Sequence, residues 1–303
     1  MKAKTLRRIL IPVLSTVAVV AVVATVAMNM FSTVMDDYLG RGASHINTIA
    51  DSESWDTNFY EDKYASTEES KADSYKLAKQ VQEEGSVLLK NNGVLPLASD
   101  ATVAPFGNAY IHPFYGQTTS SGSAKWTVNP STPRDVLQAS SLQVVDAPYQ
   151  KMLAAGDPDA IKEAEGTTSA SVNGLMGGDN QLYEYKASIY QGTESSVSGS
   201  IGMVFIGRAG QESADKKYDG YEDGTPHYLA LTQNEKDTIH FAKQNCSKVI
   251  LIISSSATVE LTPVLSGEDE VDAILQVGHV GQKGFEVLPD LLTGEVNPSG
   301  RTV

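Results

Sequence analysis

The sequence predicts an α/β protein: a mostly parallel sheet sandwiched between helices, preceded by one N-terminal transmembrane helix. Three observations predict it. Short apolar runs alternate with helical stretches along most of the chain. These runs are continuously apolar, as expected of parallel strands that are covered on both faces. Finally, a long uncharged segment follows a cluster of positive charges at the N-terminus.

Each element has its own sequence signal. The expected strands are the continuous apolar runs Thr102–Phe106, Leu142–Asp146, Ile201–Ile206, Lys248–Ser254 and Val271–Val277. The expected helices are Pro133–Ala139, Pro148–Ala164, Gln233–Asn245 and Gln282–Leu292. The third of these helices opens with Thr232 and Glu235 at the spacing of a capping box. Residues 165–199, rich in Gly, Ser and Thr, predict an excursion at the sheet edge.

A further helix is expected at the start of the folded region, from Glu68 onward. Apolar and small residues recur there at spacings of three and four, which aligns them on one helix face: Tyr75, Ala78, Val81, Gly85 and Leu88. The run of Asn91, Asn92 and Gly93 provides a left-handed stop, and Pro96 prevents continuation. The sequence therefore predicts that this helix continues past Leu88.

The N-terminus has the pattern of a membrane segment. Four cations within residues 1–8 precede an uncharged run of 23 residues, 9–31, which is long enough to cross a hydrocarbon core as a helix. The positive flank predicts a cytoplasmic N-terminus and a folded domain outside the cytoplasm, so a single-pass membrane protein. A cleaved signal peptide is the alternative, because residues 25–27 offer small side chains for cleavage. We favour the uncleaved anchor.

Residues 32–67 are expected to form an acidic linker outside the cytoplasm, and residues 68–303 the folded domain. Between Asp36 and Asp73 there are ten acidic and three basic residues. Acidic, Ser-rich sequence with few aliphatic residues buries too little surface to fold alone.

Charge and composition exclude several function classes. Lys and Arg number 23 against 37 Asp and Glu, a net charge of −14, which disfavours nucleic acid and anionic membrane surfaces as partners. The single cysteine, Cys246, has no internal disulfide partner and is expected to fill a small space in the core. His112, His227 and His279 lack metal-ligand spacing, so we expect no metal and no other cofactor.

The candidate functional segment directly follows the strand Ile201–Ile206. Residues 207–215 read GRAGQESAD, a Gly-containing loop that bears the carboxylate of Glu212. Open α/β sheets bind ligands outside the carboxyl ends of their strands. Glu212 is therefore either a site residue or a solvated loop acid. Trp126, in the loop after the first strand, either stacks on the flat face of a ligand or packs against a neighbouring domain.

Four ordered motifs recur together along residues 75–303. They are EEGSVLLKNNGVLPL at 83–97, SSGSA followed by VNP at 120–130, GRAGQESAD at 207–215, and VDAIL, GQ and GEVNPSGR between 271 and 301. Together they resemble the α/β-sandwich domain of glycoside hydrolase family 3, the β-glucosidase family. The resemblance implies retaining hydrolysis of β-linked glycosides by two carboxyl groups about 5 Å apart.

The resemblance also implies roles for single residues. Glu212 falls on the acid/base position and Asp215 on the acid that follows it, which is expected to contact substrate. The chain departs from the family motif, because Gln211 and Ser213 replace the flanking glycines and Lys216 replaces an arginine. Glu222, with Asp223 beside it, is a rival acid.

Domain order is a larger departure. The family's nucleophilic Asp belongs to a (β/α)8 barrel that usually precedes the sandwich domain and needs about 250 residues. Here only residues 1–67 precede it. We therefore expect an exchanged order, with the barrel in a longer product and this sequence truncated. The function implied is part of a membrane-anchored β-glycosidase acting on a β-linked oligosaccharide or glucoside. The alternative is a non-catalytic, carbohydrate-associated or scaffold domain at the cell surface.

Overall fold

The computed structural model describes residues 3–32, 51, 54–55, 63–113, 115, 130–156, 184–208, 224–255 and 257–302. The chain divides into two compact units, Met1–Lys63 and Tyr64–Val303. Each unit is described by itself.

The first unit contains one long helix, α1 (Ala3–Met30). Its stretch Leu10–Met30 has a mean hydropathy of 2.5 over 21 residues. At about 1.5 Å per residue, this stretch matches the thickness of a bilayer's hydrocarbon core. The hydroxyls of Thr16 and Thr25 donate to carbonyls one turn earlier, so these polar groups are satisfied within the helix. The helix is thus long and apolar enough either for a membrane anchor or for a signal sequence.

The second unit is built on a six-stranded sheet with the order β1-β6-β5-β4-β2-β3. The strands are β1 (Val87–Asn91), β2 (Thr102–Phe106), β3 (Gln143–Val144), β4 (Ile201–Arg208), β5 (Lys248–Ser255) and β6 (Ala273–Gln276). All neighbouring pairs are parallel except β1 with β6, which is antiparallel. In β4 and β5 every residue after the first is buried, as the continuous apolar runs predicted.

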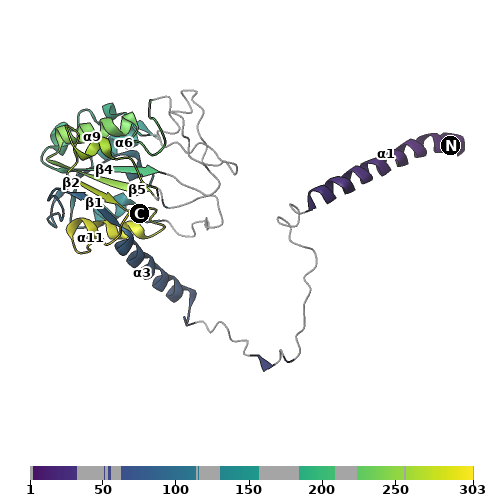
Figure 1. Cartoon of the computed structure of the whole chain (residues 1–303), viewed down its shortest axis with the longest axis horizontal. Coiled ribbons are helices and arrows are strands. Elements are labelled where there is room, and N and C mark those ends of the chain that lie inside the picture. The colour runs from purple at the N-terminus through teal and green to yellow at the C-terminus, as the bar shows by residue number, and fades with distance from the viewer. Residues whose placement is uncertain are drawn as a thin grey trace. The chain divides into compact units, whose positions relative to one another are not determined.

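Helices cover both faces of the sheet (Figure 1). On one face lie α6 (Ala147–Ala155) and α9 (Gln233–Asn245). The short helix η2 (Ala187–Tyr190) packs against both of them, and α8 (Glu194–Val197) packs against α9. On the other face lie α11 (Leu288–Thr293) and α3 (Thr67–Gly85), with α5 (Pro133–Ala139) and η3 (Gly284–Val287) packed against them. The mostly parallel, helix-covered α/β fold expected from the sequence is confirmed.

The predicted bounds hold best where a local cap fixes them. Helix α9 begins as predicted, because Thr232 Oγ1 accepts from Glu235 N at 3.2 Å and the Glu235 carboxylate accepts from Thr232 N at 2.8 Å. Helix α5 also has its predicted bounds, with Thr132 Oγ1 accepting from Asp135 N.

Other predicted bounds are wrong. Helix α6 ends at Ala155 rather than Ala164, because Gly156 adopts a φ of +82° and caps it. The stretch expected to be one helix from 282 to 292 is instead η3 followed by α11, which has Pro289 in its first turn. Strands β3 and β6 are shorter than predicted, whereas β4 and β5 run on to Arg208 and Ser255.

The helix expected to continue past Leu88 is also wrong in its second half. Helix α3 ends at Gly85, and Ser86 turns to an extended conformation. Residues 87–91 then form β1, the edge strand paired with β6. A side-chain anchor holds this junction, because the amide of Gln82 donates to Val277 O at 2.7 Å and to Ser86 Oγ at 3.0 Å. The strand therefore depends on β6, nearly 200 residues further along the chain.

The C-terminal motif closes the fold beside this junction. Gly300 N donates to Ser86 O at 3.0 Å. A Cβ at Gly300 would lie 2.6 Å from Gly85 O and 2.7 Å from Ser86 O. Only glycine fits this close approach between the end of the domain and the start of β1.

Candidate active site

The candidate site lies at the edge of the sheet where the parallel strands β2, β4, β5 and β6 have their carboxyl ends. The sequence predicted a site after β4. The predicted site residues Glu212, Asp215, Glu222 and Trp126 all lie outside the described residues. The structure does describe the residues that flank the segments containing them.

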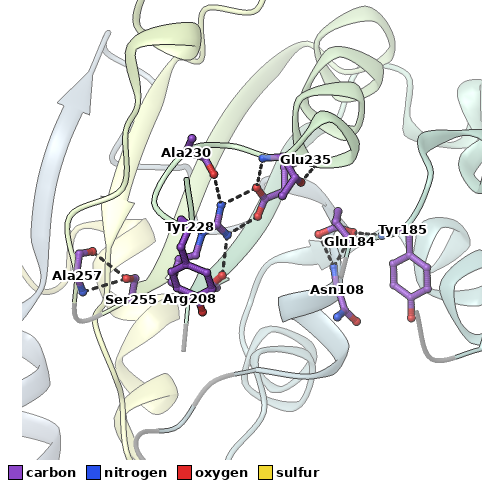
Figure 2. A network of polar contacts seen from close by, with 11 residues as sticks. Asn108, Glu184, Tyr185, Arg208, Tyr228, Ala230, Glu235, Ser255 and Ala257 are labelled. Atoms are coloured by element: carbon purple, nitrogen blue, oxygen red, sulfur yellow. Dashed lines mark hydrogen bonds and ion pairs between the residues drawn. The ribbon is translucent and has the colours of Figure 1, made fainter. Parts of the chain in front are cut away.

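Arg208, the last residue of β4, has its charged head buried at this edge; its side chain is 2% exposed. The guanidinium binds the Glu235 carboxylate through two bonds of 2.5 and 2.7 Å. It also donates to the carbonyls of Tyr228 at 2.9 Å, Ala230 at 2.9 Å and Gly207 at 2.8 Å (Figure 2). These five bonds use all five N–H donors of an arginine.

The charge of this pair is well compensated. Burial lowers the pKa of Arg208, but the Glu235 carboxylate outweighs burial and raises the pKa above its ordinary value. Glu235 is 1% exposed and is fixed by the capping box at the start of α9. A bidentate arginine–carboxylate pair has one preferred geometry, so it fixes the end of β4 against the start of α9.

The same guanidinium joins the chain on both sides of residues 209–223. Arg208 directly precedes that segment, and Tyr228 and Ala230 follow it by five and seven residues. His279, which comes after β6, adds a third contact, because its Nε2 lies 3.1 Å from Arg208 O. Since a carbonyl only accepts, this contact requires the tautomer with a proton on Nε2. The ends of β4 and β6 and the start of α9 thus converge on Arg208.

A second buried carboxylate, Glu184, lies at the end of β2 (Figure 2). It is 5% exposed and accepts from Asn108 N at 2.9 and 3.0 Å and from Tyr185 N at 2.8 Å. The pKa of Glu184 is raised to about 8, mainly by burial and also by the negative charge of Glu235, while the two backbone N–H groups act in the opposite direction. Glu184 is therefore a carboxyl group that holds a proton up to neutral pH.

Gly107 makes the turn that brings Asn108 to Glu184. Its φ is +96°, and a Cβ there would collide with the carbonyl oxygen of Phe205 in β4. The Gly107 N–H donates to the Tyr190 hydroxyl at 3.1 Å. A glycine directly after β2 thus lets the chain turn tightly against the neighbouring strand.

The segment that contains Trp126 also has described ends. Gly281 N donates to Tyr115 O at 2.6 Å, and Ser131 N donates to Gln282 O at 2.9 Å. Both ends of residues 116–130 are thereby fixed beside the chain that follows β6.

Sequence reasoning missed Arg208, Glu235 and Glu184 as structural residues of the site. The signal for the first two was present, because Arg208 follows an apolar strand and Glu235 belongs to a capping box. Glu184 has no local signal. No cluster of metal-binding side chains occurs among the described residues. Burial raises the pKa of the Cys246 thiol to about 11, which suits a neutral side chain packed against the core.

The fold is that of an α/β-sandwich domain, with the candidate site at the carboxyl ends of its parallel strands. The model of the glycosyl hydrolase family 3 C-terminal domain matches residues 86–303. The chain belongs to glycoside hydrolase family 3, and its folded unit is of the family's C-terminal type.

Curated relatives agree with this assignment. The chain is 27% identical over 236 residues to a beta-glucosidase of Ruminococcus albus, a match that covers 74% of this chain and 22% of the relative. It is 26% identical over 243 residues to the thermostable beta-glucosidase B of Acetivibrio thermocellus, covering 80% of this chain and 27% of the relative. The chain thus spans about a quarter of the length of these relatives.

Solved structures share the fold. The beta-glucosidase 3B of Thermotoga neapolitana in complex with α-D-glucose superposes with a TM-score of 0.59 at 22% identity, covering 76% of this chain and 30% of that one. A beta-glucosidase of Paenibacillus barengoltzii superposes with a TM-score of 0.57 at 22% identity, covering 74% and 23%.

Proposed function

We propose that this chain supplies the acid/base half of a retaining β-glycosidase, with Glu212 as the acid/base. The observation behind the proposal is the place of Glu212 in the chain, four residues after Arg208 at the carboxyl end of β4. Membership of family 3 supports it. The matched relatives are named beta-glucosidases, which supports a β-glucoside or β-linked oligosaccharide as substrate.

The proposed chemistry has two steps. Glu212 first gives its proton to the glycosidic oxygen while a carboxylate attacks the anomeric carbon, so the leaving group departs as an alcohol. Ionised Glu212 then takes a proton from water, and that water displaces the carboxylate from the sugar. In this scheme Asp215 binds a sugar hydroxyl and Trp126 stacks on a sugar face. Glu222 is the rival for the acid/base role.

The nucleophilic carboxylate in this scheme is an Asp of a (β/α)8 barrel. In this proposal the barrel is a further domain of the full protein. The chain covers only about a quarter of these relatives' length, which leaves room in them for such a domain.

We further propose that α1 remains attached and anchors the protein in the membrane. In this arrangement residues 1–8 are cytoplasmic, residues 32–67 form an acidic linker outside, and the domain from residue 68 onward lies outside the cytoplasm. The apolar stretch Leu10–Met30 supports the anchor. The positive charges before it support the orientation.

The alternative function is a non-catalytic, carbohydrate-associated or scaffold domain. Gln211 and Ser213 favour it, because they replace the glycines that flank the acid/base residue in the family motif.

The deciding experiment uses Glu212→Gln in a form of the protein that contains the barrel. Loss of the general acid should slow cleavage of glycosides with poor leaving groups by roughly 10²–10⁴-fold, with much less effect on the glycosylation step for activated aryl glycosides. Azide should partly rescue the second step, since it attacks without a base. The matched control is Glu222→Gln. If Glu222→Gln shows this pattern and Glu212→Gln behaves as wild type, the assignment is wrong. If neither variant changes activity, the scaffold function is favoured.

A further inference from the structure

We infer that Arg208 is the positioning residue of the proposed acid/base segment: its guanidinium holds together the two ends of the chain between which residues 209–223 lie. This inference rests on the proposed function, because Glu212 belongs to that segment. Arg208 is not a substrate contact, since its side chain is 2% exposed and every N–H donor is already bound.

The carbonyl contacts distinguish this role from that of an ordinary buried ion pair. A buried ion pair alone can often be replaced by apolar residues without loss of stability. Arg208 does more, because its Nε and Nη2 atoms bind the carbonyls of Tyr228 and Ala230, on the returning side of the segment. The planar guanidinium reaches the carboxylate and these carbonyls at once. A lysine ammonium has three donors at one point and cannot span them.

The partner of Arg208 is itself immobilised. Glu235 is 1% exposed, accepts from Thr232 N at 2.8 Å, and occupies the third position of α9. Helix α9 packs on β4 and β5. The contacts of Arg208 therefore fix the chain that follows residue 223 relative to the sheet. Strands β4 and β5 of this sheet are buried at every residue after the first.

The first test measures hydrogen exchange in this chain with Arg208→Lys. The reporters are the amides of Ala230, which donates to His227 O, and Thr232, which donates to Glu235. The amide of Ile252 in β5 reports global unfolding. Arg208→Lys should speed exchange at the two reporters by at least about tenfold more than at Ile252, because only the local contacts are lost. Equal acceleration at all three amides would overturn the inference.

A matched control lies at the other end of the strands, where β5 and β6 begin. Asp272 is 8% exposed and accepts from Val249 N at 2.9 Å and Lys248 Nζ at 2.9 Å. Asp272→Asn removes a comparable buried charge far from the candidate site. It should change the exchange rates at Ala230 and Thr232 by the same factor as that at Ile252.

The second test uses activity in the barrel-containing form. Arg208→Lys should lower the turnover of poor-leaving-group glycosides by about 10–100-fold more than that of activated aryl glycosides, because a misplaced acid loses its advantage only where a proton must move. Asp272→Asn should lower both rates equally. Glu235→Gln keeps the shape of the pair and serves if Arg208→Lys does not fold; it should show a weaker form of the same asymmetry.

The outcomes separate the two proposals. If Glu212→Gln shows the leaving-group asymmetry but Arg208→Lys and Glu235→Gln behave like Asp272→Asn, the positioning role is refuted and the proposed function stands. If Glu212→Gln shows no asymmetry, the proposed function fails, and the exchange experiment still decides whether Arg208 holds the two ends of the segment.

Discussion

The backbone N–H of Asn108 points at both oxygens of the Glu184 carboxyl group, at 2.9 and 3.0 Å. This contact joins the chain after β2 to the segment that begins at residue 184. Helix η2, which comes three residues later, packs against α9. Because Glu184 is buried, its protonation state is coupled to the stability of this junction.

Glu184 should make the domain less stable as the pH rises. The pKa of Glu184 is raised from 4.5 to about 8 in the folded protein, so the folded state holds the proton more tightly than the unfolded state. The stabilisation is therefore complete below about pH 4.5 and is lost as the pH rises through about 8. Urea unfolding of residues 64–303 between pH 5 and 9 measures this slope.

Glu184→Gln should flatten that slope, because an amide does not titrate. It should also destabilise the domain at every pH, since an amide has one oxygen to accept the bonds that the two oxygens of the carboxyl group receive. Glu194→Gln is the control. Glu194 is an exposed acid whose pKa is lowered by backbone hydrogen bonds, so its titration lies below this pH window and the wild-type slope should remain. A wild-type protein with no loss of stability toward pH 9 would contradict the prediction.

Two neighbouring glycines should respond to alanine with opposite signs. Gly300→Ala places a Cβ 2.6 Å from Gly85 O and should destabilise the domain by about 1–3 kcal/mol. A Cβ at Gly85 meets nothing within 4 Å, so Gly85→Ala at the end of α3 should stabilise it by up to about 1 kcal/mol. Thermal unfolding of both variants measures the difference. Equal effects would show that the close approach at Gly300 is unimportant.

The mature protein should retain α1. Its apolar stretch of 21 residues is long enough to remain in the bilayer as an anchor. The intact mass of protein extracted from membranes with detergent should correspond to a chain that includes residues 1–27. A mature N-terminus at Met28 would instead show that a signal sequence is removed.

The 303-residue chain alone should show little or no β-glucosidase activity. Retaining hydrolysis needs a nucleophile as well as an acid/base, and we assign the nucleophile to a barrel domain. An assay with an aryl β-glucoside tests this directly. Turnover at about 1 per second or faster by the purified chain would contradict the assignment.

Local sequence determined much of this protein. The continuous apolar runs predicted β2, β4 and β5 because strands buried on both faces need apolar side chains at every position. The Thr232–Glu235 pair predicted the start of α9 because both hydrogen bonds of a capping box form within four residues. The sequence also predicts a site at the carboxyl ends of the parallel strands, by the general rule for such sheets, and this location stays a prediction. The assignments of Glu212, Asp215, Glu222 and Trp126 stay predictions.

Tertiary structure decided the rest. Leu88 fits the helical spacing of α3, yet it lies in β1 because pairing with β6 satisfies its backbone across the sheet. Arg208 ends a buried strand although arginine is rarely buried, because Glu235 and two carbonyls reach its guanidinium from beyond residue 224. Glu184 holds its proton because folding buries its carboxyl group against a segment that contains Asn108, 76 residues earlier in the chain. The spacing of residues along the chain does not predict these contacts, because each of them joins segments that only folding brings together.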